Sequence, residues 1–230
     1  MVDGSDSDRR RRWLRWRFLY AATALLLIAG MLRAQAAMTA DELAARVDRH
    51  YNSLHSLEVH FVQHYDGMGM HRTQSGVLLL KKPGRMRWTY TDPDGKLFIL
   101  DGRDAFSYMP GESEAQRMSE KKLDDLQSPL RFLLGHTDLQ KELTGLSMTP
   151  DGNGEYVLSG VPKGMEQRIA KLKITATASG TIRAMSIEET DGVTNSFDFS
   201  GELENAPAPA SAFLFTPPPG VHVVEAMPPV

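Results

Sequence analysis

Residues 76–90 read Gly-Val-Leu-Leu-Leu-Lys-Lys-Pro-Gly-Arg-Met-Arg-Trp-Thr-Tyr, and this stretch decides the fold class. The first half, Val77 to Lys81, is a nearly continuous apolar run, typical of a largely buried strand. Lys82-Pro83-Gly84 is a turn signal. After the turn, apolar and polar residues alternate with the period of a half-buried strand. The stretch therefore predicts two antiparallel strands joined by a tight turn.

The same alternation continues on both sides of this hairpin. Leu57, Val59 and Phe61 alternate with polar residues before it, and turn signals such as Asp101-Gly102 separate short apolar runs after it. We expect about 11 strands in a single curved antiparallel sheet around a core. The remaining strands are expected at 97–100, 105–109, 115–118, 142–148, 155–160, 168–176, 182–188 and 196–200, with a last short one at Phe213-Leu214-Phe215.

Two regions carry helical signals. Thr39 and Glu42 form a capping box, and apolar residues follow at spacings of four, four and three, which predicts an amphipathic helix over 40–54. Residues 120–135 break the strand pattern and predict two short helices that end at Gly135. The fold class is thus mainly β with some α.

The N-terminal segment differs from the rest of the chain. Six arginines between residues 9 and 17 precede an apolar run from Phe18 to Met31, and Ala34-Gln35-Ala36 is a small-residue cleavage signal. The run has 14 residues, whereas an uncleaved membrane anchor needs roughly 20. We therefore predict a signal peptide at 1–36, cleaved after export, and one domain at 37–230 located in the periplasm.

Charge and cysteine content exclude several classes of function. Residues 1–36 hold seven of the 26 Lys and Arg and three of the 29 Asp and Glu, so the remainder has 19 basic and 26 acidic residues, a net charge of −7. An acidic domain binds nucleic-acid phosphates poorly. The chain has no cysteine, which excludes disulfides, thiolate metal sites, a cysteine nucleophile and a lipid-modified N-terminal cysteine.

Enzyme signatures are missing from the sequence. No metalloprotease, nucleophile-elbow, phosphate-loop or dinucleotide motif occurs. His60 and His64 are four apart, and on a strand that spacing is about 13 Å, too long for one metal ion. We expect no catalytic residue, metal or cofactor. A hydrolase that uses Glu188 and Asp191 is the enzymatic alternative, with an exposed strand end as the simpler interpretation.

The unusual feature is the apolar content of the first strands, where period two allows most of the large side chains to face one side. One interpretation is an ordinary sandwich or barrel core. The other is a concave apolar surface that accepts acyl chains, which the abundance of methionine (12 residues) favours. The residues concerned are Leu78, Leu80, Met86, Trp88, Tyr90, Phe98, Leu100, Phe106 and Tyr108.

Several stretches, taken in order, resemble the outer-membrane lipoprotein carrier family, LolA. The hairpin of residues 76–90 is similar to the family's signature, and Phe61-Val62-Gln63 precedes it as in the family. The closing stretch, Phe213 to Val221, resembles the family's Phe-x-Phe-x-Pro-Pro-x-Gly-Val. Together these stretches span nearly the whole of residues 37–230.

The resemblance implies an unclosed β-barrel with an N-terminal helix and short lid helices over a hydrophobic cavity. It also implies a non-enzymatic periplasmic chaperone that receives acylated lipoproteins from an ATP-driven transporter in the inner membrane. The carrier passes them to an outer-membrane acceptor. We expect a monomer. Two alternatives share the fold, namely a carrier of another lipid, such as a glycolipid or pigment-lipid, and a lipid-binding sensor or adaptor.

The site residues combine the apolar strand pattern with the resemblance, which by position implies the lid residues and the cavity residues Met86, Trp88, Phe106 and Tyr108. Lid residues are expected at Pro129, Leu130, Phe132 and Leu133, and the acyl-chain cavity at Leu78, Leu80, Met86, Trp88, Tyr90, Phe98, Phe106 and Tyr108. Family members have an arginine before the proline of the hairpin turn, which holds the lid shut. This chain has Lys82 there, so the latch candidates are Lys82 and Arg85.

Overall fold

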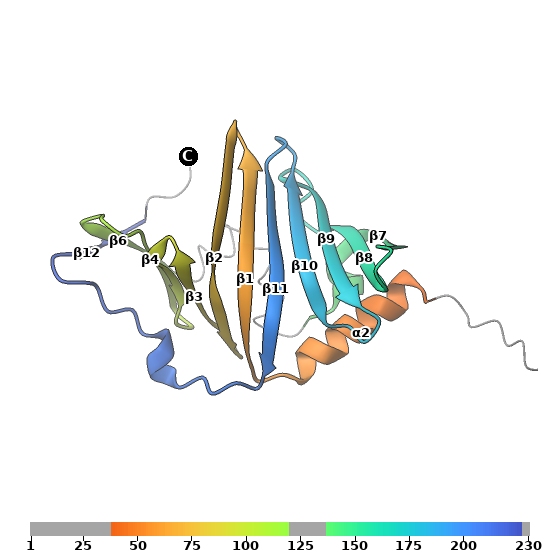
Figure 1. Cartoon of the computed structure of the whole chain (residues 1–230), viewed down its shortest axis with the longest axis horizontal. Helices are drawn as coiled ribbons and strands as arrows, with labels where there is room; N and C mark the ends of the chain where they lie inside the picture. Colours follow the sequence, from red (N-terminus) through yellow and green to blue (C-terminus); the bar gives the residue numbers. More distant parts are fainter. Residues whose placement is uncertain (1–37, 120–136, 227–230) are drawn as a thin grey trace, which may run out of the picture. The chain divides into compact units, whose positions relative to one another are not determined.

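A computed structural model describes residues 38–119 and 137–226, which form one twelve-stranded sheet with an N-terminal helix (Figure 1). The strands run in the order β12-β6-β5-β4-β3-β2-β1-β11-β10-β9-β8-β7. Their bounds are β1 Ser56–Gly67, β2 Met70–Lys81, β3 Arg85–Asp92, β4 Asp94–Leu100, β5 Asp104–Tyr108, β6 Glu114–Ser119, β7 Leu143–Pro150, β8 Glu155–Pro162, β9 Ile169–Thr177, β10 Ile182–Glu189, β11 Thr194–Glu204 and β12 His222–Glu225.

The sheet consists of two meanders that meet at β1 and β11. Strands β1 to β6 pair in sequence order, β7 to β11 do the same, and β11 returns to lie antiparallel beside β1. Among the described residues the two outermost strands, β7 and β12, do not pair with each other, so the sheet is unclosed. The predicted fold class is confirmed, with twelve strands and one parallel pair, β12 on β6.

The hairpin of residues 76–90 forms as its sequence predicts. Leu80 pairs with Met86 and Leu78 pairs with Trp88 across β2 and β3, and the turn residue Gly84 has a φ of +67°. At the far end of the pairing, a Cβ on Gly76 would lie 2.2 Å from the Thr89 carbonyl oxygen. Only glycine lets the two backbones approach this closely at that position.

The N-terminal helix α2 covers Ala40–Ser53 and begins with the predicted capping box. The Thr39 hydroxyl accepts from the Glu42 amide at 3.2 Å, and the Glu42 carboxylate accepts from the Thr39 amide at 3.1 Å. The helix buries Leu43, Ala44, Val47 and Tyr51. It contacts β7, β8 and the short helix α4, Leu139–Glu142.

The expectation of a strand at 213–215 is wrong. Residues Ala210–Phe213 form a 3-10 helix, η2, and the last strand is β12 instead. Prolines supply no amide hydrogen for a sheet, and Pro207, Pro209 and three prolines at 217–219 flank the segment. The apolar character of Phe213 reflects burial of its ring, which is 1% exposed, rather than a strand period.

Two predictions lie outside the described residues. They are the signal peptide at 1–36 and the helical region at 120–135. No helix within 38–119 and 137–226 is long and apolar enough to cross a membrane.

Candidate functional site

Six of the eight predicted cavity residues share one face of the sheet. Directly opposed residues of antiparallel strands point to the same side. Leu78 lies opposite Trp88, and Trp88 lies opposite Phe98, so one apolar row crosses β2, β3 and β4. The residues on this side, hereafter the inner face, include Leu78, Leu80, Met86, Trp88, Tyr90 and Phe98.

The structure does not bring Phe106 and Tyr108 together with these six. Phe106 pairs with Ile99 and Tyr108 pairs with Leu97, which places both on the opposite side, the outer face. There the Phe106 ring stacks on Phe215, with ring centroids 5.2 Å apart. This placement corrects the expectation, because the segment after β11 covers part of the outer face. Both sides of β4 therefore carry large apolar side chains, and period two alone cannot say which side is inner.

An aromatic cluster forms the centre of the inner face. The Phe61 ring contacts Trp88 edge-on, with centroids 4.6 Å apart, and Tyr90 at 5.1 Å. Trp88 also lies 5.4 Å from Phe197 of β11, and Phe197 stacks on Phe199 at 6.2 Å. Sequence reasoning missed the two β11 phenylalanines. Their alternation with polar residues was the available signal, but only the β1–β11 pairing puts them beside Trp88.

The polar atoms of the cluster have internal partners. The Trp88 indole Nε1 donates to the Met86 sulfur at 2.7 Å, and the Tyr90 hydroxyl donates to the Gln63 side-chain oxygen at 2.9 Å. Burial raises the pKa of Tyr90 from 10.0 to about 12, because the phenolate would lose its hydration. The cluster therefore presents an apolar surface to a ligand, because its polar groups already form hydrogen bonds within the protein.

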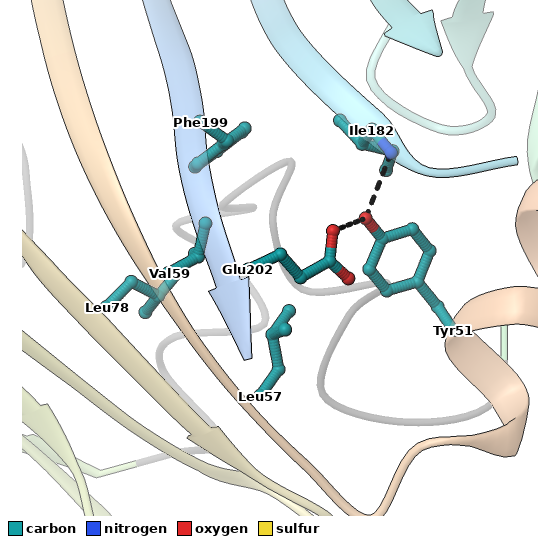
Figure 2. Close-up of a pocket in the computed structure, with 7 residues that line it drawn as sticks. All are labelled: Tyr51, Leu57, Val59, Leu78, Ile182, Phe199 and Glu202. Carbon is teal, nitrogen blue, oxygen red and sulfur yellow. Dashed lines mark hydrogen bonds between the residues drawn. The ribbon is translucent and has the colours of Figure 1, made fainter. Parts of the chain in front are cut away.

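A pocket opens on the inner face next to this cluster (Figure 2). Five of its wall residues are apolar, and one of them, Leu78, belongs to the predicted cavity. The empty space between its walls, with the adjoining open solvent included, is about 280 Å³. Its walls are Tyr51, Leu57, Val59, Leu78, Ile182, Phe199 and Glu202.

One end of the pocket is polar, and Tyr51 of α2 organises it. Its hydroxyl accepts from the Ile182 amide at 3.0 Å and donates to the Glu202 carboxylate at 3.5 Å (Figure 2). Burial, and next the negative charge of Glu202, raise the pKa of Tyr51 well above its ordinary value. The phenol thus stays protonated and holds α2 against β10 and β11.

The same end of the pocket gathers three metal-ligating side chains. His50 Nε2 lies 3.0 Å from a carboxylate oxygen of Glu202 and 3.8 Å from one of Glu204. All three ligand atoms lie within 4.8 Å of one another. A hydrogen bond between His50 Nε2 and the Glu202 carboxylate accounts for the shortest of these contacts, so the geometry needs no metal ion. The cluster joins residues over 150 positions apart, which no local sequence motif could indicate.

The two latch candidates each donate a hydrogen bond to a backbone carbonyl in the described part of the chain. Lys82 Nζ donates to the Tyr51 carbonyl at the C-terminal end of α2, at 2.6 Å, and burial lowers the pKa of Lys82. Arg85 Nε donates to the Asp101 carbonyl at 3.2 Å. The lid residues Pro129, Leu130, Phe132 and Leu133 lie outside the described residues, so the latch stays a prediction.

The acidic residues of the enzymatic alternative have ordinary surface roles. Glu188 pairs with Lys173 across neighbouring strands, and Glu189 lies 3.6 Å from Arg168. The Asp191 carboxylate accepts from the Val193 amide at 3.0 Å and shapes the β10–β11 turn. These contacts account for the acidic residues as strand-surface and turn residues.

The chain is similar in sequence to proteins of one known family. The family model of the outer membrane lipoprotein carrier protein LolA matches residues 52–216. An outer-membrane lipoprotein carrier protein of Nitrosospira multiformis is 31% identical over 67% of this chain and 73% of its own length. The protein of that name from Cupriavidus pinatubonensis is 30% identical over 92% of this chain and all of its own. A solved LolA superfamily protein of Nitrosomonas europaea is 13% identical, with a TM-score of 0.42 over 78% of this chain and 99% of its own.

Proposed function

Because the chain belongs to the family of outer membrane lipoprotein carrier proteins, we propose that its inner face binds the acyl chains of lipoproteins in transit. The protein is a carrier and not an enzyme. The observation that supports this role most directly is the apolar row across β2, β3 and β4, which continues through the aromatic cluster to β11. This surface is apolar over several neighbouring strands, as a binding site for acyl chains requires.

The energetics favour a site that buries the acyl chains of the cargo only in part. Burial of one CH₂ group is worth about 0.8 kcal/mol, so three chains of about 16 carbons would gain more than roughly 30 kcal/mol if fully buried. Such binding would prevent release, since non-covalent affinities saturate near roughly 20 kcal/mol. A carrier must therefore hold its cargo far more weakly than full burial allows.

The packing of the inner face supplies a reason for weak binding. Phe61 and Trp88 are each at least 95% buried, and part of the roughly 280 Å³ of empty space in the pocket beside them is open solvent. Cargo must separate side chains that already pack together, and the lost contacts offset part of the gain from burying the acyl chains. The empty and loaded states then differ little in free energy, which permits transfer in both directions.

The partners follow from the carrier role. We place the protein in the periplasm, released from a signal peptide at residues 1–36. It takes acylated lipoproteins from an ATP-driven transporter of the inner membrane and delivers them to an acceptor at the outer membrane. Pro129, Leu130, Phe132 and Leu133 act as the lid of the acyl-chain site, and Lys82 or Arg85 as its latch.

A census of bound cargo tests the proposal. The protein is purified from the periplasm without detergent, extracted with organic solvent, and its ligands are identified by mass spectrometry. We expect polypeptides that carry a diacylglyceryl group. The Phe199→Asp variant, purified in parallel, places a charge in the pocket wall and should carry far less of the same material.

Other results would redirect the assignment. Free phospholipid, glycolipid or pigment as the main ligand would make the protein a carrier of another lipid on the same fold. Equal amounts of lipoprotein on the wild type and on Phe199→Asp would place the cargo elsewhere on the molecule. Recovery of no apolar ligand would contradict carriage by the exported protein.

A further inference from the structure

The turn between β1 and β2 holds a methionine in an unfavourable backbone conformation. Gly67 pairs with Met70, which leaves Met68 and Gly69 as a two-residue loop. Their φ values are +52° and +73°, as in the mirror-image turns that favour Asn-Gly. Glycine and asparagine tolerate positive φ well, whereas a long side chain there is uncommon. The turn geometry itself therefore does not explain why Met68 occupies this position.

The same methionine also exposes most of its side chain. Met68 is 80% exposed and Met70 is 43% exposed, so neither stabilises the fold through extensive burial. The base of the turn is nevertheless well packed, since a Cβ on Gly67 would lie 2.7 Å from a Val193 methyl group. A firmly held turn thus presents two apolar side chains to the outside. An unfavourable conformation without compensating burial indicates a role in contact with another molecule.

Behind the tip lie an aromatic and a basic side chain, Tyr65 and Arg72, of the types found at membrane interfaces. The Arg72 guanidinium lies over the Tyr65 ring, 4.9 Å from its centroid, and His71 lies 3.1 Å from Asp66. Tyr65 is three residues from Met68, which on a strand is about 10 Å. Amphipathic elements bury their apolar side to a depth of about 5–10 Å, with aromatic and basic residues at the level of the headgroups.

The shape of the tip favours a lipid surface over a protein partner. The β1–β2 hairpin stands at the top of Figure 1, and its pairing with β3 begins only at Ser75, five residues from Met70. A hairpin apex offers far less than the about 800 Å² per partner of a stable protein–protein interface. Flexible methionine side chains adapt to a disordered apolar medium.

We propose that the hairpin tip, Met68 to Met70, inserts into the surface of a membrane and brings the carrier to the bilayer. This inference goes beyond acyl-chain carriage and does not require bound cargo. Without residues 1–36 the chain has a net charge of −7, so attraction to anionic lipids is not the driving force. The two apolar side chains drive insertion of the tip, so membrane binding should depend only weakly on salt concentration.

Labelled variants test the proposal directly, since the chain contains no cysteine. Met68→Cys carries an environment-sensitive dye, and Leu203→Cys is the matched control. Leu203 is 56% exposed and pairs with Glu58, near the opposite end of β1. The protein is taken from the periplasmic fraction and mixed with vesicles of phosphatidylethanolamine and phosphatidylglycerol. We expect the dye at position 68 to move into an apolar environment, and the dye at position 203 to stay in water.

A second measurement separates membrane binding from folding. The double variant Met68→Asn, Met70→Ser should lower the vesicle partition coefficient about tenfold or more, as loss of two apolar side chains requires. Met68→Asn alone should leave Tm unchanged or raised, because asparagine suits the turn. Unchanged partitioning of the double variant would overturn the proposal. This holds even if the double variant transfers cargo less well to a protein acceptor, because the tip would then contact a protein and not a membrane. A clear fall in Tm of Met68→Asn would likewise overturn it, since Met68 would then serve the fold.

Discussion

Replacement of Phe199 by aspartate should separate acyl-chain binding from folding. Phe199 lines the pocket on the inner face and is only half-buried. Phe106 is the matched control, since it is also half-buried but lies on the outer face and stacks on Phe215. Phe199→Asp removes an apolar wall and puts a carboxylate into the site, whereas Phe106→Asp makes the same change on the other side of the sheet.

The expected magnitudes follow from the burial of the two rings. Full burial of a phenylalanine side chain is worth about 1.5–3 kcal/mol, so a half-buried ring contributes about 1 kcal/mol to folding. For a domain of this size that lowers Tm by roughly 2–4 °C. An acyl chain that loses contact with the Phe199 ring binds at least about tenfold more weakly, since a tenfold change corresponds to about 1.4 kcal/mol. Phe106→Asp should lower Tm similarly and leave acyl-chain binding unchanged.

Displacement of a fluorescent fatty acid by a synthetic lipopeptide measures the binding, and a thermal melt of each variant measures the stability. Trp88 is less suitable as a probe. It is 5% exposed, and truncation of a buried tryptophan costs about 3–5 kcal/mol, a large part of the about 5–15 kcal/mol that stabilises a domain. Wild-type binding by Phe199→Asp, or equal losses in both variants, would refute the assignment of the inner face as the acyl-chain site.

Three further predictions concern the framework of the site. Lys82→Met removes the hydrogen bond to the Tyr51 carbonyl and should lower the free energy of unfolding in urea by about 1–2 kcal/mol; an unchanged value would show that Lys82 does not hold α2. Gly76→Ala places a Cβ 2.2 Å from the Thr89 carbonyl oxygen and should destabilise the fold by at least about 1–3 kcal/mol, while Ser75→Ala on the same strand should be nearly neutral by the same denaturant titration. The pKa of Tyr90 rises from 10.0 to about 12 on folding, so its stabilising contribution is complete below pH 10 and is lost as the pH rises through 12; Tyr90→Phe should lose less stability over that range, and an identical pH profile would contradict the assignment.

The sequence determined the local structure of this protein. The capping box of Thr39 and Glu42 fixes the start of α2 through contacts within one turn. The hairpin of residues 76–90 sets its own register, because the turn and the alternating pattern that specify it lie within one short stretch. The family resemblance also rests on such local stretches, and the family model confirms it.

Tertiary structure alone decided which residues form the site. Phe106 looks like Phe98 in the sequence, yet the two lie on opposite faces, because the segment around Phe215 covers the outer side of β5. Phe197 joins the cluster only because β11 returns to the centre of the sheet beside β1. Tyr51 and Glu202 are 151 positions apart, and they meet only when α2 packs against the sheet. Strand periodicity tells which residues share a side of one strand, but long-range strand pairing and the segments that cover each face decide which side becomes the binding surface.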